Sequence, residues 1–163
     1  MTFIRLAALY VLCVAAQWWL GAHLSPGGVT ANVLLDAAVA VAVLGGPVAA
    51  HGFAFMCGLY FDFMSPRMFG GHALAFTLMA RAIWFVRWRL DFPTPPSQMA
   101  LAAAASVFAA AFHSLLGIVF AGGFIWRGWA FSVFTPVANA VAAPFVFALA
   151  AVFAPPPDKS RRR

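Results

Sequence analysis

The stretch HGFAFMCGLYFDFMSPRMFGGHALAFTLMARAIWFVRWR, residues 51–89, contains two long apolar segments joined by a turn rich in glycine and proline. The first apolar segment already begins at Pro47 and continues to Met64, interrupted only by His51 and Asp62. This is about the length that a helix needs to cross a hydrocarbon core of roughly 30 Å. We therefore expect two membrane-spanning helices, residues 47–64 and 69–86, with a tight turn between them.

One stripe of the first helix carries its single carboxylate. In a helix over 47–64, His51, Phe55, Gly58 and Asp62 follow at helical spacing and lie along one side. A glycine lets a neighbouring helix approach closely, and a carboxylate that faces lipid costs about 3 kcal/mol. We therefore expect this stripe, with Gly58 and Asp62, to form an interface with protein, either within the chain or with a partner.

The composition of the whole chain indicates an integral membrane protein. Of its 163 residues, 64% are hydrophobic and 9% charged, against about 25% charged residues in globular domains. Residues 1–163 are predicted to form a single all-α transmembrane domain, and six spans of about 20 residues leave no room for a soluble domain. The predicted spans are 3–20, 29–44, 47–64, 69–86, 98–120 and 129–153.

Several details of these spans are also predicted. The first apolar run is interpreted as a span with tryptophans at the membrane interface, although a cleaved signal peptide is the competing interpretation. Ser97 is expected to cap the fifth span. Pro136 and Pro144 predict a kink or an unwound turn in the last. Cys13 and Cys57 lie within apolar runs and predict neither a disulfide nor a metal site.

The distribution of basic residues predicts the orientation. With six spans both termini share one side, which carries Arg5, Arg87, Arg89 and the basic residues of the C-terminal tail, whereas the other side carries only Arg67 and Arg127. The positive-inside rule then places both termini in the cytoplasm. Attraction to anionic membrane lipid accounts for the net charge of +6, so no nucleic-acid partner is expected.

Four polar residues inside the predicted spans are candidate functional residues. Asp36, Asp62 and His113 fall in the outer half of the membrane, and Arg81 falls in the inner half. The alternative is structural: each carboxylate pairs with a donor and sets helix register, and His113, like the other histidines, is a packing residue. For Arg81 the choice is between a partner contact and a side chain that reaches the inner surface beside Trp84 and Trp88.

No motif for catalysis, metal binding or cofactor binding is present. The sequence contains no H-E-x-x-H, no G-x-S-x-G and no phosphate-binding glycine loop. We therefore expect no enzyme activity, no metal and no cofactor. An intramembrane enzyme that uses Asp36, Asp62 or His113 is the weakest hypothesis, because no nucleophile and base are brought together by spacing.

The residues of the central stretch resemble a family motif. Gly58-Leu59, Asp62, Ser65 and Gly70 follow the pattern G-[FL]-x-x-D-x-x-[SG]-x-x-x-x-G of the rod shape-determining protein MreD family. The layout of the remaining chain is also similar to that family, at Gln17, Asn32, Leu34-Leu35, Ala73-Leu74 and Pro144. Asp36 does not belong to the family pattern, and no role is transferred to it.

The resemblance implies a non-enzymatic component of the bacterial cell inner membrane. Members of the family maintain rod shape and help organise peptidoglycan synthesis within the cell-elongation complex, the elongasome or Rod complex. They bind MreC directly, and the wider assembly contains MreB, RodZ, RodA and a class B penicillin-binding protein. Their fold is similar to the substrate-binding subunits of energy-coupling-factor transporters. Gly58, Asp62 and Gly70 would then shape the outer half of the bundle.

That similarity of fold leaves a second function open. The chain would then be a small-molecule-binding subunit of a membrane transporter, with the polar groups of the outer half lining a pocket.

Overall fold

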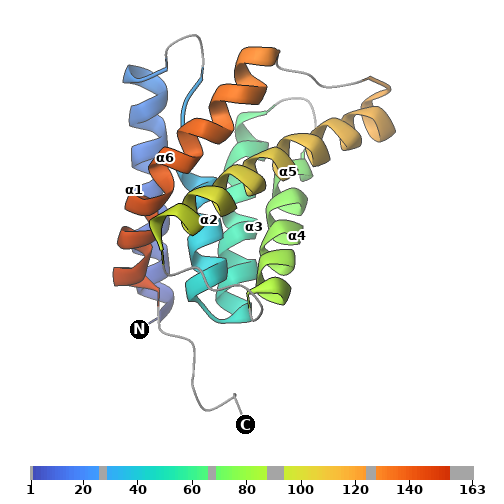
Figure 1. Cartoon of the computed structure of the whole chain (residues 1–163). Coiled ribbons are helices and arrows are strands. Elements are labelled where there is room, and N and C mark those ends of the chain that lie inside the picture. Colours follow the sequence, from blue (N-terminus) through green and yellow to red (C-terminus); the bar gives the residue numbers. More distant parts are fainter. Residues whose placement is uncertain (1, 26–28, 66–68, 88–93, 124–127, 155–163) are drawn as a thin grey trace.

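The computed structural model describes residues 2–25, 29–65, 69–87, 94–123 and 128–154 (Figure 1). Within these residues every regular element is a helix, which confirms the predicted all-α class. The helices are α1 (Thr2–His23), α2 (Val33–Leu44), α3 (Pro47–Met64), α4 (Gly71–Val86), α5 (Pro95–Ala121) and α6 (Trp129–Phe153).

Three of the helices are long and apolar enough to cross a membrane. They are the segments Phe3–His23, Pro95–Phe120 and Phe131–Phe153 of α1, α5 and α6. Two further helices, α2 and α4, are apolar but shorter. At 12 residues α2 is only about 18 Å long, less than the roughly 30 Å of a hydrocarbon core.

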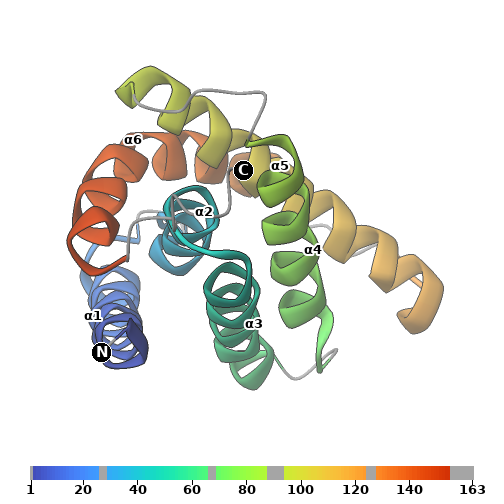
Figure 2. The same ribbon diagram turned by 90° about the horizontal axis from the view of Figure 1, so that it is seen from below.

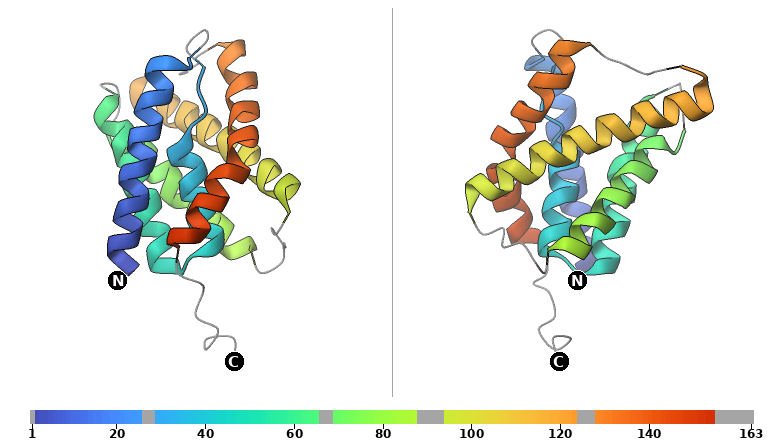
Figure 3. Two further views of the ribbon diagram at one scale, coloured as in Figure 1. Left: turned by 90° about the vertical axis from the view of Figure 1, so that its left-hand side faces the viewer. Right: turned by 45° about the vertical axis from the view of Figure 1, so that its right-hand side comes forward.

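Helix α2 lies at the centre of the bundle. All residues from Val33 to Ala42 are buried, and Figure 2 shows the other helices arranged around this one. The α3–α4 hairpin lies on one side, while α5 runs obliquely across the bundle (Figures 1 and 2). The start of α1 and the end of α6 lie at the same end of the molecule (Figure 3).

The outside of the bundle is apolar. Phe3 of α1, Val48 of α3 and Phe145 of α6 are each at least three-quarters exposed. Monomeric soluble proteins rarely expose continuous apolar patches larger than a few hundred Å². The described surface therefore supports membrane character.

The predicted cap of α5 is wrong, and the prediction for the prolines of α6 holds only in part. Helix α5 begins at Pro95 with Thr94 as its N-cap residue, and Ser97 lies in the first turn, where its hydroxyl donates to the Thr94 carbonyl at 2.8 Å. Proline is favoured at the first position of a helix because its missing N–H has no partner there in any case. Of the kink or unwound turn predicted at Pro136 and Pro144, the unwound turn is not seen: α6 continues as one helix through both prolines and follows a curved path (Figure 2).

Some sequence predictions lie outside the described residues. These are the ones that concern Arg67, Trp88, Arg89, Arg127 and the basic tail 159–163.

Candidate functional site

Asp62, near the end of α3, caps the N-terminus of α4. Its carboxylate accepts hydrogen bonds from the backbone N–H groups of His72 and Ala73, each at 2.9 Å. The first N–H groups of a helix have no partner within the helix, and a negative charge is favourable at that end. The N-cap residue Gly70 has no side chain for this purpose, so Asp62 supplies the cap from the neighbouring helix. As expected for a carboxylate facing protein, Asp62 is 1% exposed.

Gly58 and Gly70 make this arrangement possible. A Cβ atom on Gly58 would lie 2.6 Å from the nitrogen of Ala73 and in still closer contact with the His72 carbonyl oxygen. The α4 backbone therefore reaches α3 only because residue 58 is glycine. Gly70 has φ +91°, a left-handed conformation that favours glycine and directs the chain into α4.

The predicted stripe on α3 is confirmed only in part. Gly58 and Asp62 are buried against α4, whereas Phe55 is 47% exposed. The buried face of α3 instead runs through Ala54 and Cys57.

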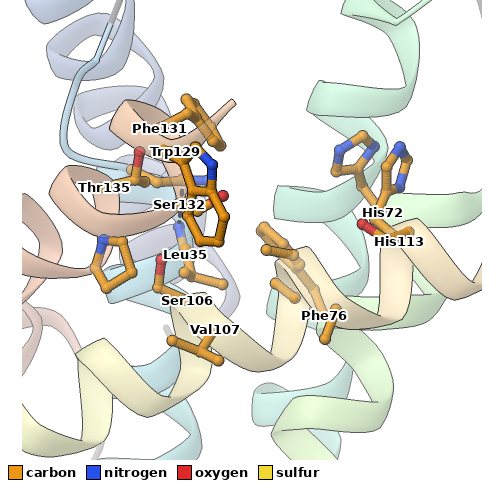
Figure 4. A pocket seen from close by; sticks show the side chains of 16 residues that line it. Leu35, His72, Phe76, Ser106, Val107, His113, Trp129, Phe131, Ser132 and Thr135 are labelled. Atoms are coloured by element: carbon orange, nitrogen blue, oxygen red, sulfur yellow. Dashed lines mark hydrogen bonds between the residues drawn. The ribbon is translucent and has the colours of Figure 1, made fainter. Parts of the chain in front are cut away.

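A pair of stacked histidines extends the Asp62 unit to α5. The Nδ1 atom of His72 lies 3.0 Å from Asp62 Oδ1. The His72 ring stacks on the ring of His113 at 4.2 Å between centroids, and Figure 4 shows the two rings side by side. The structure thus joins Asp62 and His113, two predicted site residues, through His72.

A second polar cluster surrounds the N-terminus of α2. Asn32 caps its own helix by accepting from the Leu35 N–H at 2.9 Å. Gln17 of α1 accepts from the Val33 N–H at 2.8 Å, and Asn139 of α6 accepts from the Asn32 N–H at 2.6 Å. Side chains from three helices therefore satisfy donors at the start of the central helix.

Asp36 lies one turn after Asn32 in α2 and is fully buried. Neither of its carboxylate oxygens has a hydrogen-bond partner among the described residues. The structural alternative, a carboxylate paired with a nearby donor, is therefore seen at Asp62 and not at Asp36.

Arginines lie at the opposite end of the bundle. The Nη1 atom of Arg87 donates to the Gly45 carbonyl at 2.6 Å and to the carbonyls of Ala42 and Val43 at 3.3 Å each. Carbonyl groups at a helix C-terminus attract cations, so Arg87 caps the end of α2. Arg81 is exposed and lies over the Trp84 ring at 5.5 Å.

A cleft of about 580 Å³ lies between α4, α5 and α6, beside the first turn of α2. Figure 4 shows Trp129 and Thr135 of α6 on one side and the His72–His113 pair on the other. Of the predicted site residues, only His113 lines it. The part of the chain that the structure describes contains no group of three or more metal-binding side chains.

No family model, curated protein or solved structure matches the chain. Functional inference therefore depends on the residues and their arrangement.

Sequence reasoning missed the capping roles of Arg87, Gln17 and Asn139 and the position of Thr135 in the cleft. Arg87 counted only as a positive charge near the membrane, and Asn139 lies 107 residues from its partner Asn32. A local spacing pattern does not report such distant pairs. The capping role of Thr94 did have a local signal, because Thr-Pro-Pro at 94–96 places a cap residue directly before proline.

Proposed function

We propose that this chain is a non-enzymatic, multi-pass component of the bacterial cell inner membrane that binds MreC within the Rod complex. The observation that supports this is the hairpin of α3 and α4. Gly58, Asp62 and Gly70, which carry the resemblance to MreD, act together there in a single close helix contact. A motif of this kind builds a specific helix contact, as expected of a structural component.

The proposal includes six membrane crossings in a fold similar to that of the energy-coupling-factor substrate-binding subunits. Three helices long enough to span, together with the apolar exterior, support a membrane location. The start of α1 and the end of α6 lie at the same end of the molecule (Figure 3). This arrangement is consistent with an even number of crossings and with both termini in the cytoplasm. Through MreC the protein would help organise peptidoglycan synthesis by RodA and the class B penicillin-binding protein, beside RodZ and the MreB filament.

Co-purification with the cognate MreC tests this function. The two proteins are co-expressed, the chain is affinity-tagged, and MreC is detected in the eluate from membranes solubilised in mild detergent. We expect MreC to co-elute. A control with a tagged, unrelated membrane protein should retain none. A well-expressed, monodisperse chain that retains no MreC, in detergent or in crosslinked membranes, would contradict the proposal.

A second candidate function is a small-molecule-binding subunit of a membrane transporter. The cleft between α4, α5 and α6 favours it, because its volume falls in the roughly 300–1,000 Å³ range of small-molecule sites. Mass spectrometry of the solvent extract of the purified protein distinguishes the two. A stoichiometric water-soluble compound in the extract, with no retention of MreC, would favour the transporter subunit.

A further inference from the structure

The cleft between α4, α5 and α6 has a mostly apolar lining. Aromatic rings come from α4 with Phe76 and from α6 with Trp129 and Phe131. The α5 side contributes Val107 and the small residues 109–111. Small side chains on one wall and aromatic rings on the others leave room for a slender apolar group such as an alkyl chain.

One buried hydroxyl in this cleft has no partner among the described residues. Thr135 lines the cleft on the α6 side and is 7% exposed, and its Oγ1 atom makes no hydrogen bond within the described chain. Leaving a buried hydroxyl unsatisfied costs about 1–3 kcal/mol. A ligand atom that accepts a hydrogen bond from Thr135 would remove this cost.

The electrostatic character of the cleft favours an anion. Trp129, the first residue of α6, lines it. The starts of α2 and α4 lie beside it as well, but their first N–H groups are already bonded to side-chain acceptors, and each lies near a carboxylate, Asp36 or Asp62, so α6 supplies the positive helix end. Helix N-termini carry partial positive charge and attract anions. The described residues that line it include no aspartate, glutamate, lysine or arginine, and the carboxylate of Asp62, behind His72, is already engaged with the α4 N–H groups.

The position of the cleft gives access from the side of the bundle. Helices α5 and α6 diverge toward the C-terminus of α5 and the N-terminus of α6 (Figures 1 and 3). The apolar side chains Val119, Phe120 and Trp129 there are more than half exposed, and Trp129 also lines the cleft. An alkyl chain that enters the cleft from this side would therefore lie beside apolar side chains.

We propose that this cleft binds a single-chain amphiphile with an anionic carboxylate or phosphate head group. The head lies beside Thr135, toward the start of α6, and the alkyl chain lies along α5 toward the surface. This inference stands independently of MreC binding, because it uses neither the α3–α4 motif nor a partner protein.

Photocrosslinking in nanodiscs of phosphatidylcholine tests the proposal. The probe is palmitate with a diazirine near the end of its chain, and labelled peptides are identified by mass spectrometry. We expect saturable labelling within residues 106–136. Palmitate and dodecyl phosphate serve as competitors that distinguish a carboxylate from a phosphate head, and dodecanol is the neutral control. Competition by either anion, with dodecanol at least tenfold weaker, supports the proposal.

Two pairs of variants locate the site. Thr135→Val removes the hydroxyl and should weaken binding about tenfold, whereas Thr135→Ser keeps it and should bind like the wild type. Ala110→Trp fills the cleft and should abolish saturable labelling, whereas Ala148→Trp places the same ring on an exposed site of α6 outside the lining and should not. Monodispersity of each variant on size exclusion establishes that it is folded.

Three results would overturn the proposal. They are labelling spread evenly over the exposed faces of all helices, dodecanol competing as well as palmitate, and saturable labelling of wild-type strength in both Ala110→Trp and Thr135→Val.

Discussion

Asp62 and Asp36 are both buried carboxylates, but their surroundings differ. Asp62 accepts two backbone hydrogen bonds and contacts His72, whereas the Asp36 carboxylate has no partner among the described residues. Removing an acceptor leaves its donors unsatisfied at about 1–3 kcal/mol each, while replacing an unpaired buried polar group by an apolar one is often neutral or stabilising. The two positions therefore form a matched pair for mutation.

Asp62→Leu should lower stability by about 2–5 kcal/mol, because it leaves the N–H groups of His72 and Ala73 without their acceptor. Asp62→Asn retains one acceptor oxygen and should lose less, with partial function preserved. Asp36→Leu, as the control, should leave the melting temperature unchanged or raised. Thermal unfolding in detergent and folded yield measure these effects. Normal yield and rod morphology for both Asp62 variants would contradict the capping role.

Gly58→Ala should destabilise the hairpin by about 1–3 kcal/mol or more, because the new methyl group collides with the α4 backbone at His72 and Ala73. Gly52→Ala, on an exposed position of the same helix with nothing within 4 Å of the added Cβ, should stabilise the protein by about 0.5–1 kcal/mol. The melting temperatures of the two variants should thus move in opposite directions. Equal shifts in melting temperature would show that α4 can move away from α3 in Gly58→Ala without loss of stability.

At the scale of the element, the central helix α2 depends on side chains from its neighbours at both ends. Gln17 and Asn139 satisfy donors at its start, and Arg87 satisfies carbonyls at its end. A helix of 12 residues is marginal alone in water, and most of the stability of such helices comes from tertiary contacts. Its position is therefore set by α1, α4 and α6 together.

Arg87→Leu should lower the stability of the last turn of α2 by about 1–3 kcal/mol, because three carbonyl groups lose a charged hydrogen-bond donor. Hydrogen–deuterium exchange should be faster for the amides of Val41–Leu44 and unchanged at the opposite end of the helix. Arg81→Leu is the control, since Arg81 is exposed and contacts the Trp84 ring. Unchanged exchange in Arg87→Leu would exclude the capping role.

The helix boundaries show what local sequence reports. Gly45-Gly46-Pro47 predicts the break between α2 and α3, which the structure confirms with Pro47 as the first residue of α3. The start of α2 was predicted at residue 29 from hydrophobicity, but it lies at Val33 because Asn32 is the cap. Apolar composition identifies a segment, whereas its ends are set by individual capping bonds.

At the scale of the whole molecule, composition predicted a helical membrane protein. The helical spacing of Gly58 and Asp62, with the cost of a carboxylate that faces lipid, predicted that Asp62 is buried against protein. A pocket among the polar groups of the outer half was an alternative, but its walls were not predictable, because the lining residues come from the start of α2 and from α4, α5 and α6 and span 104 positions, from Asn32 to Pro136. The divergence of α5 and α6 results from how the helices pack. The alanine-rich sequence of α5 predicts close contact with another helix but does not say which helix that is.

The arrangement of the chain ends makes a prediction for the whole molecule. The proposed six crossings, with both termini in the cytoplasm, would place the loops after the first, third and fifth spans outside and the loop after the fourth span inside. Single cysteines in a background lacking Cys13 and Cys57 should therefore react with an impermeant maleimide on intact spheroplasts at Ser25 and Ser65. Those at Thr94 and Ser160 should react only after permeabilisation. Because α2 is shorter than the thickness of a hydrocarbon core, its crossing is the part of the proposed topology that most needs this test. Were α2 to remain on one face, Ser25 and Ser65 would label from opposite sides, and both the six-span topology and the shared side of the termini would be excluded.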